Sequence, residues 1–147
     1  MLGQIDWQSD KKRIRIKFMD NQKIQALKKI FKQFDSLKLV YLFGSQAAKK
    51  HGELSDHDFA FFIDEKKIEA FQTSLAIAGQ ISLYLETDNI DTVIINHIDS
   101  PELRYSIIKE GKLIYEIEPY KVIIEPKIMN EYFDFRFYLR KYSLTRT

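Results

Sequence analysis

Three aspartates offer the chemistry of a metal-dependent enzyme. Asp56 and Asp58 stand two residues apart at the start of an apolar segment. On a strand, both carboxylates would leave the same face while His57 points away. Adjacent carboxylates repel each other, and a hard divalent cation such as Mg2+ relieves that repulsion by binding oxygen atoms from both. Asp91 begins a later apolar segment and would complete the set if the two strands are neighbours.

A glycine and a serine stand where a phosphate group could bind beside these carboxylates. Gly44 and Ser45 follow an apolar segment, and the glycine allows the backbone to approach a ligand closely. The serine hydroxyl and the following amides could donate hydrogen bonds to a triphosphate. Three carboxylates can hold two metal ions about 3.5–4 Å apart, which stabilise an in-line phosphoryl displacement. Asp-x-Asp alone is a weak signal, but its combination with Gly44-Ser45 and a later aspartate at the start of a strand indicates chemistry on a phosphoryl group.

Four strands are expected to position these groups. Residues 37–43 and 57–63 are rich in β-branched and aromatic side chains, and the second segment is apolar enough along its length to predict a central strand. Residues 91–95 and 112–116 predict two further strands. Residues 13–18 alternate charged and apolar side chains, which suits an edge strand or a solvated arm.

Helices are expected between and after these strands. Apolar steps of three and four predict helices over residues 21–34, 66–85 and 127–142. A further helix should begin at Ser100 and Pro101 and end at Gly111, with Leu103 and Ile107 facing inward. A short helical turn is expected within residues 45–55. The predicted inward stripes of the three longer helices are Ile24, Leu27, Phe31 and Phe34; Ile68, Phe71, Leu75, Ala78, Ile81 and Leu85; and Ile128, Tyr132, Phe135, Leu139 and Tyr142.

The order of these elements predicts an α/β fold, with helices packed on a small mixed β-sheet. At 147 residues with 45% hydrophobic content, residues 1–147 are expected to form one domain with an aromatic-rich C-terminal helix. The aromatic stripe of that helix is wider than one packed face needs, so part of it is expected to be exposed, as a surface for a partner or a dimer.

Composition narrows the function classes. Because 23 Lys+Arg balance 21 Asp+Glu, no overall field favours nucleic acid, and no direct nucleic-acid binding is expected. The absence of cysteine excludes disulfides, thiolate metal sites and a cysteine nucleophile. No apolar run approaches the length of a membrane helix or resembles a signal sequence, so we expect a cytoplasmic protein without a membrane partner. The three histidines share no metal-ligand spacing, and packing or surface roles are expected for them.

Residues 44–58, GSQAAKKHGELSDHD, resemble the signature of the DNA polymerase beta type nucleotidyltransferases. The particular likeness is to the minimal nucleotidyltransferases, or MNT proteins. The segment DTVIIN that begins at Asp91 resembles the strand carrying the third carboxylate of that family. SPELRY and KEGK, within residues 100–112, resemble the segment that follows it, and Tyr132-Phe133-Asp134 resembles the closing helix.

The resemblance implies a nucleotidyltransferase fold and an antitoxin of the HEPN/MNT toxin-antitoxin type. Such an antitoxin transfers AMP from ATP to a tyrosine of a HEPN-domain ribonuclease toxin, which silences the toxin. By resemblance, Asp56 and Asp58 would bind both Mg2+ ions, and Asp91 would bind the catalytic ion and help to deprotonate the incoming hydroxyl. Gly44 and Ser45 would hold the triphosphate. The resemblance also implies a complex with the toxin as a hetero-oligomer, alongside any homo-oligomer.

Two alternatives stay open at this point. The family often has Arg-Gly where this chain has Ala48-Lys49, which would suit an antitoxin that binds and masks its partner without turnover. The other alternative is nucleotidyl transfer to a small molecule such as an aminoglycoside, which would require a deep acceptor pocket.

Overall fold

A computed structural model describes residues 19–43 and 57–142. The predictions for residues 13–18 and 45–55, and those for Gly44, Ser45 and Asp56, lie outside these ranges. Within them, no helix is long and apolar enough to cross a membrane.

Among residues 19–43 and 57–142, one mixed sheet holds four strands, in the order β3-β2-β1-β4. Strands β1 (Leu37–Phe43), β2 (His57–Ile63) and β4 (Lys112–Glu116) have the predicted bounds, and β3 (Ile90–Ile94) begins one residue earlier than predicted. β1 pairs with β2 and β4 in antiparallel fashion, and β2 pairs with β3 in parallel. The predicted small mixed sheet flanked by helices is confirmed, and β2 is central as expected.

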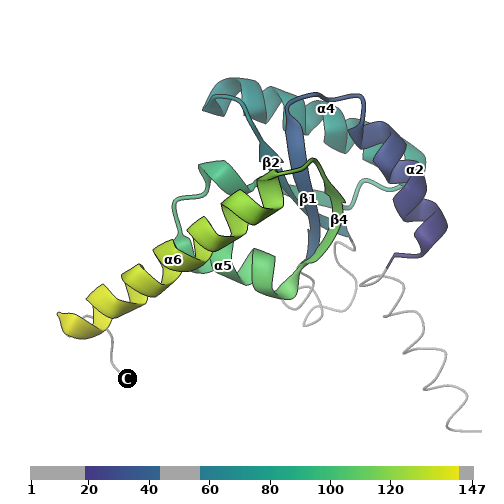
Figure 1. The fold of residues 1–147 in the computed structure, drawn as a ribbon. Coiled ribbons are helices and arrows are strands. Elements are labelled where there is room, and N and C mark those ends of the chain that lie inside the picture. Colours follow the sequence, from purple (N-terminus) through teal and green to yellow (C-terminus); the bar gives the residue numbers. More distant parts are fainter. Residues whose placement is uncertain (1–18, 44–56, 143–147) are drawn as a thin grey trace, which may run out of the picture.

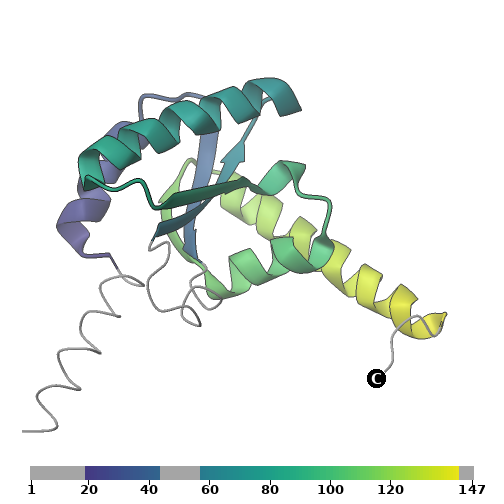
Figure 2. The ribbon, with the colours of Figure 1, turned by 180° about the vertical axis from the view of Figure 1, so that it is seen from behind.

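Two helical layers cover the sheet (Figures 1 and 2). Helices α2 (Asn21–Phe31) and α4 (Lys67–Leu85) lie on one face, while α5 (Pro101–Glu110) and α6 (Tyr120–Lys141) lie on the other. A short 3-10 helix, η1 (Ile95–His97), follows β3 and precedes α5. β2 alternates between the two layers because successive strand side chains leave opposite faces. Phe59, Phe61 and Ile63 join the core on the α2 and α4 side, and Ala60 joins the other.

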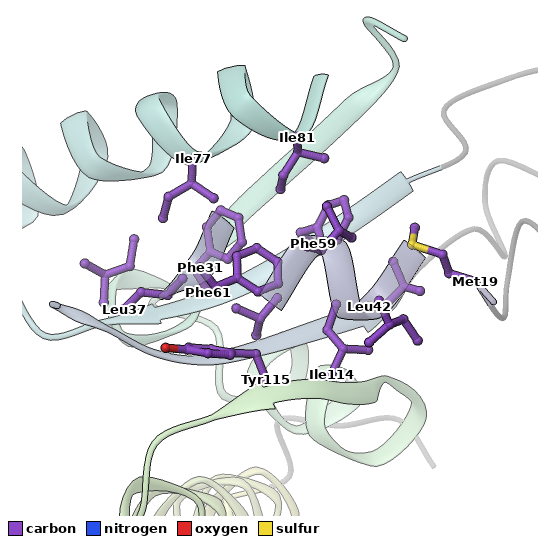
Figure 3. Packing of buried hydrophobic residues seen from close by; sticks show 14 of the residues in the cluster. Met19, Phe31, Leu37, Leu42, Phe59, Phe61, Ile77, Ile81, Ile114 and Tyr115 are labelled. Carbon is purple, nitrogen blue, oxygen red and sulfur yellow. The ribbon is translucent and has the colours of Figure 1, made fainter. Parts of the chain in front are cut away.

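The core between the sheet and helices α2 and α4 is the larger of the two and is rich in aromatic side chains (Figure 3). Phe31 of α2 meets Phe61 with ring centroids 6.4 Å apart and Tyr115 with centroids 5.4 Å apart. The Asp20 side chain caps α2 by accepting a hydrogen bond from the backbone N–H of Lys23 at 2.9 Å. The helix ends at Phe31, three residues before the predicted end.

Helix α4 confirms the predicted stripe only in its last turns, where Ile81 is buried and Leu85 packs against the core, and it turns a different face to the sheet before them. Ile68, Phe71 and Leu75 are more than half exposed, whereas Ser74 and Ile77 are buried. Small side chains on the inner face let the helix lie close to the sheet, and they outweigh the apparent stripe of larger residues. The Ser74 hydroxyl donates to the carbonyl oxygen of Phe71 at 2.8 Å, so its burial leaves no unsatisfied donor.

The last two helices confirm part of the prediction. Ser100 caps α5 by accepting from the backbone N–H of Leu103 at 3.1 Å, and Gly111 follows its last residue. Ile107 is buried as expected, but Leu103 is 40% exposed and does not face inward. α6 begins seven residues before the predicted start at residue 127 and includes Pro126.

Candidate active site

Two of the three predicted carboxylates lie opposite each other in the sheet. Asp58 and Asp91 are Cα partners in the parallel pair of β2 and β3. On its other side, Asp58 is the Cα partner of Phe43, the last residue of β1. The end of β1 and the starts of β2 and β3 therefore meet at one edge of the sheet.

Both carboxylates belong to the face covered by α5 and α6. Asp58 shares its face with Ala60, and Asp91 shares its face with Val93, because alternate residues of a strand point the same way. Ala60 and Val93 both pack in the core cluster on the α5 and α6 side. Asp58 is partly exposed and Asp91 is exposed, so solvent reaches both residues. The register places two carboxylates on one face of adjacent strands, and carboxylate oxygens are among the ligands that Mg2+ binds.

The remaining predicted site residues adjoin this edge in the sequence. Gly44 and Ser45 follow Phe43 directly, and Asp56 precedes His57, the first residue of β2. All three lie outside residues 19–43 and 57–142, so their roles stay predictions. Within those ranges no group of three His, Cys, Asp or Glu side chains could hold a metal ion. A site with three carboxylates would therefore include one from outside those ranges, and Asp56 is the residue predicted for it.

Gly111 allows α5 to end against the site edge. A Cβ atom at this position would lie 2.5 Å from the carbonyl oxygen of Ile107 and 3.2 Å from the Cβ atom of Phe43. The backbone N–H of Gly111 donates to that same carbonyl at 2.8 Å. The sequence predicted Gly111 as a helix terminator, but its close approach to β1 becomes visible only in three dimensions.

The Asn96 side chain, just after β3, hydrogen-bonds to the last residue of β2 at the opposite edge of the sheet from the carboxylates. Its side-chain Oδ1 accepts from the backbone N–H of Ile63 at 3.1 Å, and its Nδ2 donates to the carbonyl oxygen of Ile63 at 2.7 Å. Next to it, His97 Nε2 lies 2.9 Å from the carbonyl oxygen of Glu65, a packing role of the kind expected for the histidines. The Asn96 amide takes the place of a strand partner after β3 has ended, and sequence analysis did not identify this role.

Polar contacts hold α6 against the sheet and against α5. The Tyr41 hydroxyl donates to Glu125 Oε2 at 2.5 Å. Burial, and then this hydrogen bond to a carboxylate, raise the pKa of Tyr41 above its ordinary value of 10.0. Farther along the helix, Arg104 of α5 lies 3.3 Å from Glu131. These contacts secure the first half of α6.

Comparison with known proteins identifies a family for most of this fold. Residues 25–120 match the family described as "Polymerase beta, Nucleotidyltransferase". This range includes β1 to β4 and the site edge. The protein adenylyltransferase MntA of Aphanizomenon flos-aquae (strain 2012/KM1/D3) is 33% identical over 88 residues, which cover 54% of this chain and 57% of the relative. The match thus spans little more than half the length of that curated relative.

Solved structures share the architecture. One contains a tri-AMPylated Shewanella oneidensis HEPN toxin in complex with MNT antitoxin; the matched chain has a TM-score of 0.62 and 20% identity, with coverage of 84% of this chain and 94% of that one. Another is a toxin-antitoxin crystal structure with AMP-PNP, with a TM-score of 0.59, 21% identity and the same coverage of both chains. At these identities the likeness establishes the nucleotidyltransferase fold.

Proposed function

The chain belongs to the polymerase beta nucleotidyltransferase family, and from this premise we propose that it is an antitoxin that transfers AMP from ATP to a tyrosine of a HEPN ribonuclease. The modification neutralises the toxin. The observation that carries the proposal is the pairing of Asp58 with Asp91 beside the end of β1. The AMPylated toxin and the AMP-PNP complex among the similar structures support the donor and the acceptor.

Asp56, Asp58 and Asp91 would hold two Mg2+ ions. The fit rests on the donor set, since carboxylate oxygens from neighbouring strands are the ligands this ion prefers. When bound, the ions would supply charge stabilisation to the attacking and leaving oxygens of the displacement. Gly44 and Ser45 would bind the triphosphate through backbone amides and the serine hydroxyl, because they follow Phe43 at the same edge.

The reaction forms one phosphorus–oxygen bond and breaks another. The tyrosine oxygen attacks the α-phosphorus of ATP, the bond from that phosphorus to the bridging oxygen of the β-phosphate breaks, and pyrophosphate leaves. The product is an AMP ester of tyrosine. In this proposal Asp91 accepts the hydroxyl proton through a carboxylate oxygen, a role that suits its exposed position at the edge of the sheet.

We also propose that residues 1–147 act as a single nucleotidyltransferase domain in the cytoplasm. All four described strands share one sheet, which supports the single domain. The absence of cysteine suits a reducing compartment where ATP is present.

Label transfer tests the proposal directly. The full chain is incubated with Mg2+, ATP labelled at the α-phosphate and its cognate HEPN ribonuclease. We expect label on the ribonuclease, a mass increase of whole AMP groups and loss of RNA cleavage. Asp58→Asn should lower the rate of transfer by about 100-fold or more, since it removes charge that acts in the transition state. Folding should persist, because one of two neighbouring negative charges is removed.

Asp88→Asn is the matched control. Asp88 is an exposed aspartate in the bend between α4 and β3, and we expect it to leave transfer unchanged. An unlabelled ribonuclease of unaltered mass that is nonetheless inhibited would favour masking without turnover. Label on an aminoglycoside in place of the ribonuclease would favour a small-molecule acceptor. Undiminished transfer by Asp58→Asn would rule out the carboxylate site.

A further inference from the structure

The distal half of α6, defined as the helical residues 133–141 with the C-cap residue Tyr142, extends beyond the body of the molecule (Figures 1 and 2). At a rise of 1.5 Å per residue, these ten or so residues span about 15 Å. Phe133, Phe137, Tyr138 and Tyr142 are each more than half exposed. Surface aromatics in such number on one helix half indicate a contact surface.

Along one stripe of α6, the side chains become more exposed towards the C-terminal end. Ile128 is 4% exposed in the core. One turn later, Tyr132 stacks on Tyr105 of α5 with centroids 4.1 Å apart and planes 4° from parallel. The stripe continues through Leu139 to Tyr142, which is 59% exposed. The face that packs on the body therefore runs on past the point where the body ends.

The outermost aromatics contact each other within the helix. Tyr138 and Tyr142 stack at 6.2 Å, and Phe137 meets Tyr138 edge to face at 5.7 Å. The Lys141 Nζ atom lies over the rings of Phe137 and Tyr142 at 5.9 and 5.6 Å. These contacts order the side chains before any partner arrives, which lowers the entropy cost of binding.

The charge on the distal half of α6 indicates which kind of partner surface would complement it. Arg136, Arg140 and Lys141 outnumber the single acid, Asp134, so this half carries a net positive charge. Two copies would bring like charges together, which disfavours self-association through this surface. A partner with acidic side chains around an apolar surface would complement both the charge and the aromatics.

We infer that the distal half of α6 is the docking site for the acceptor protein, and that it binds an apolar groove bordered by carboxylates on that protein. This inference rests on the proposed function, because it assigns the surface to the HEPN ribonuclease. The α6 stripe lies on the same side of the sheet as the face from which Asp58 and Asp91 project. Docking there holds the acceptor on the side of the carboxylates.

Binding to the HEPN ribonuclease without ATP tests the docking site separately from the chemistry. The double variant Tyr138→Ser with Tyr142→Ser should weaken the affinity of the full chain about 30-fold or more, because exposed aromatic anchors dominate interfaces. The matched control is Ile68→Ser with Phe71→Ser, an apolar pair on α4 that is 71% and 57% exposed. We expect the control to change the affinity less than about threefold.

Charge reversal provides a second, independent variant. Arg136→Glu with Arg140→Glu should slow association and reduce its dependence on salt concentration. Circular dichroism melting shows whether each variant is folded. If the serine double variant does not fold, the affinity of the charge-reversal variant tests the docking site.

The outcomes separate the docking inference from the proposed function. Full affinity in both α6 variants would overturn the docking site even if wild-type transfer occurs. A wild-type chain that binds through these residues but transfers no AMP would support docking and refute the proposed reaction. A dimer of this chain alone that Tyr138→Ser with Tyr142→Ser dissociates would identify a second copy as the occupant and overturn the inference.

Discussion

Replacing Gly111 with alanine should both destabilise the fold and disturb the site edge. The added Cβ atom would lie 2.5 Å from the carbonyl oxygen of Ile107, closer than real contacts allow, and 3.2 Å from the Cβ atom of Phe43. Both neighbours are held, one by the helix backbone and the other by strand pairing to Asp58. Either α5 or the end of β1 must therefore move.

The expected cost follows from overpacking at a rigid contact. Such insertions cost about 1–3 kcal/mol, which lowers the melting temperature of a domain of this size by about 3–9 °C. The φ of Gly111 is −79°, a value that alanine adopts readily, so the cost arises from the contact and not from backbone strain. Because Phe43 lies opposite Asp58, the rate of AMP transfer should fall even well below the melting temperature.

Gly79→Ala is the matched control with the opposite sign. Gly79 lies within α4, and a Cβ atom there would meet nothing within 4 Å. Alanine in a helix interior is favoured over glycine by about 0.5–1 kcal/mol, so the melting temperature should rise by about 2–3 °C with transfer unchanged. Calorimetry and the label assay measure both effects. Equal stability of the two variants would refute the contact argument.

Two further substitutions probe the contacts that hold the sheet and α6. Asn96→Ala leaves both backbone groups of Ile63 without these side-chain partners, and urea denaturation should show a loss of about 2–3 kcal/mol; a loss below 0.5 kcal/mol, on the order of a neutral surface change, would contradict that role. Tyr41→Phe removes the donor to Glu125 and should cost about 1–2 kcal/mol at neutral pH. The folded-state pKa of Tyr41 is raised, so its contribution is fully present below its ordinary pKa of 10.0 and is lost as pH rises from there towards the folded value. Stability of the wild type should accordingly decline above that pH, and Tyr41→Phe should make the decline shallower; an unchanged slope would show that the hydroxyl titrates normally.

Strand patterns were predictable because each strand carries a local signal. The bounds of β1, β2 and β4 follow from apolar runs that end at polar residues or glycine. The predicted bounds of β3 were one residue too late in the sequence. The pairing of Asp58 with Asp91 was predicted conditionally on neighbouring strands, and the structure supplies that condition. Site chemistry could be anticipated to this extent because the carboxylates mark the starts of strands.

The buried faces of the helices were harder to predict because they depend on how each helix packs against the sheet. On α4 the larger residues Ile68 and Phe71 form the more conspicuous stripe, but close packing favours the face with Ala70 and Ser74. The start of α6 was also predicted too late, because the helix begins at Tyr120 and includes Pro126, although a proline within a helix removes one backbone hydrogen bond. The carbonyl group that Pro126 leaves without an N–H partner belongs to Val122, which is 71% exposed, so water can satisfy it. Neither outcome is encoded in local periodicity.

The strand order has a consequence for synthesis of the chain. β4 is the last of the described strands along the sequence, yet it pairs with β1, the first of them. Tyr115 of β4 also packs against Phe31 of α2, the first described helix. A nascent chain therefore cannot close its sheet until β4 has left the ribosome, because pairing between distant segments must wait for both. Until then, apolar surface of β1 remains uncovered, and a fragment that stops before Lys112 should need a chaperone or aggregate.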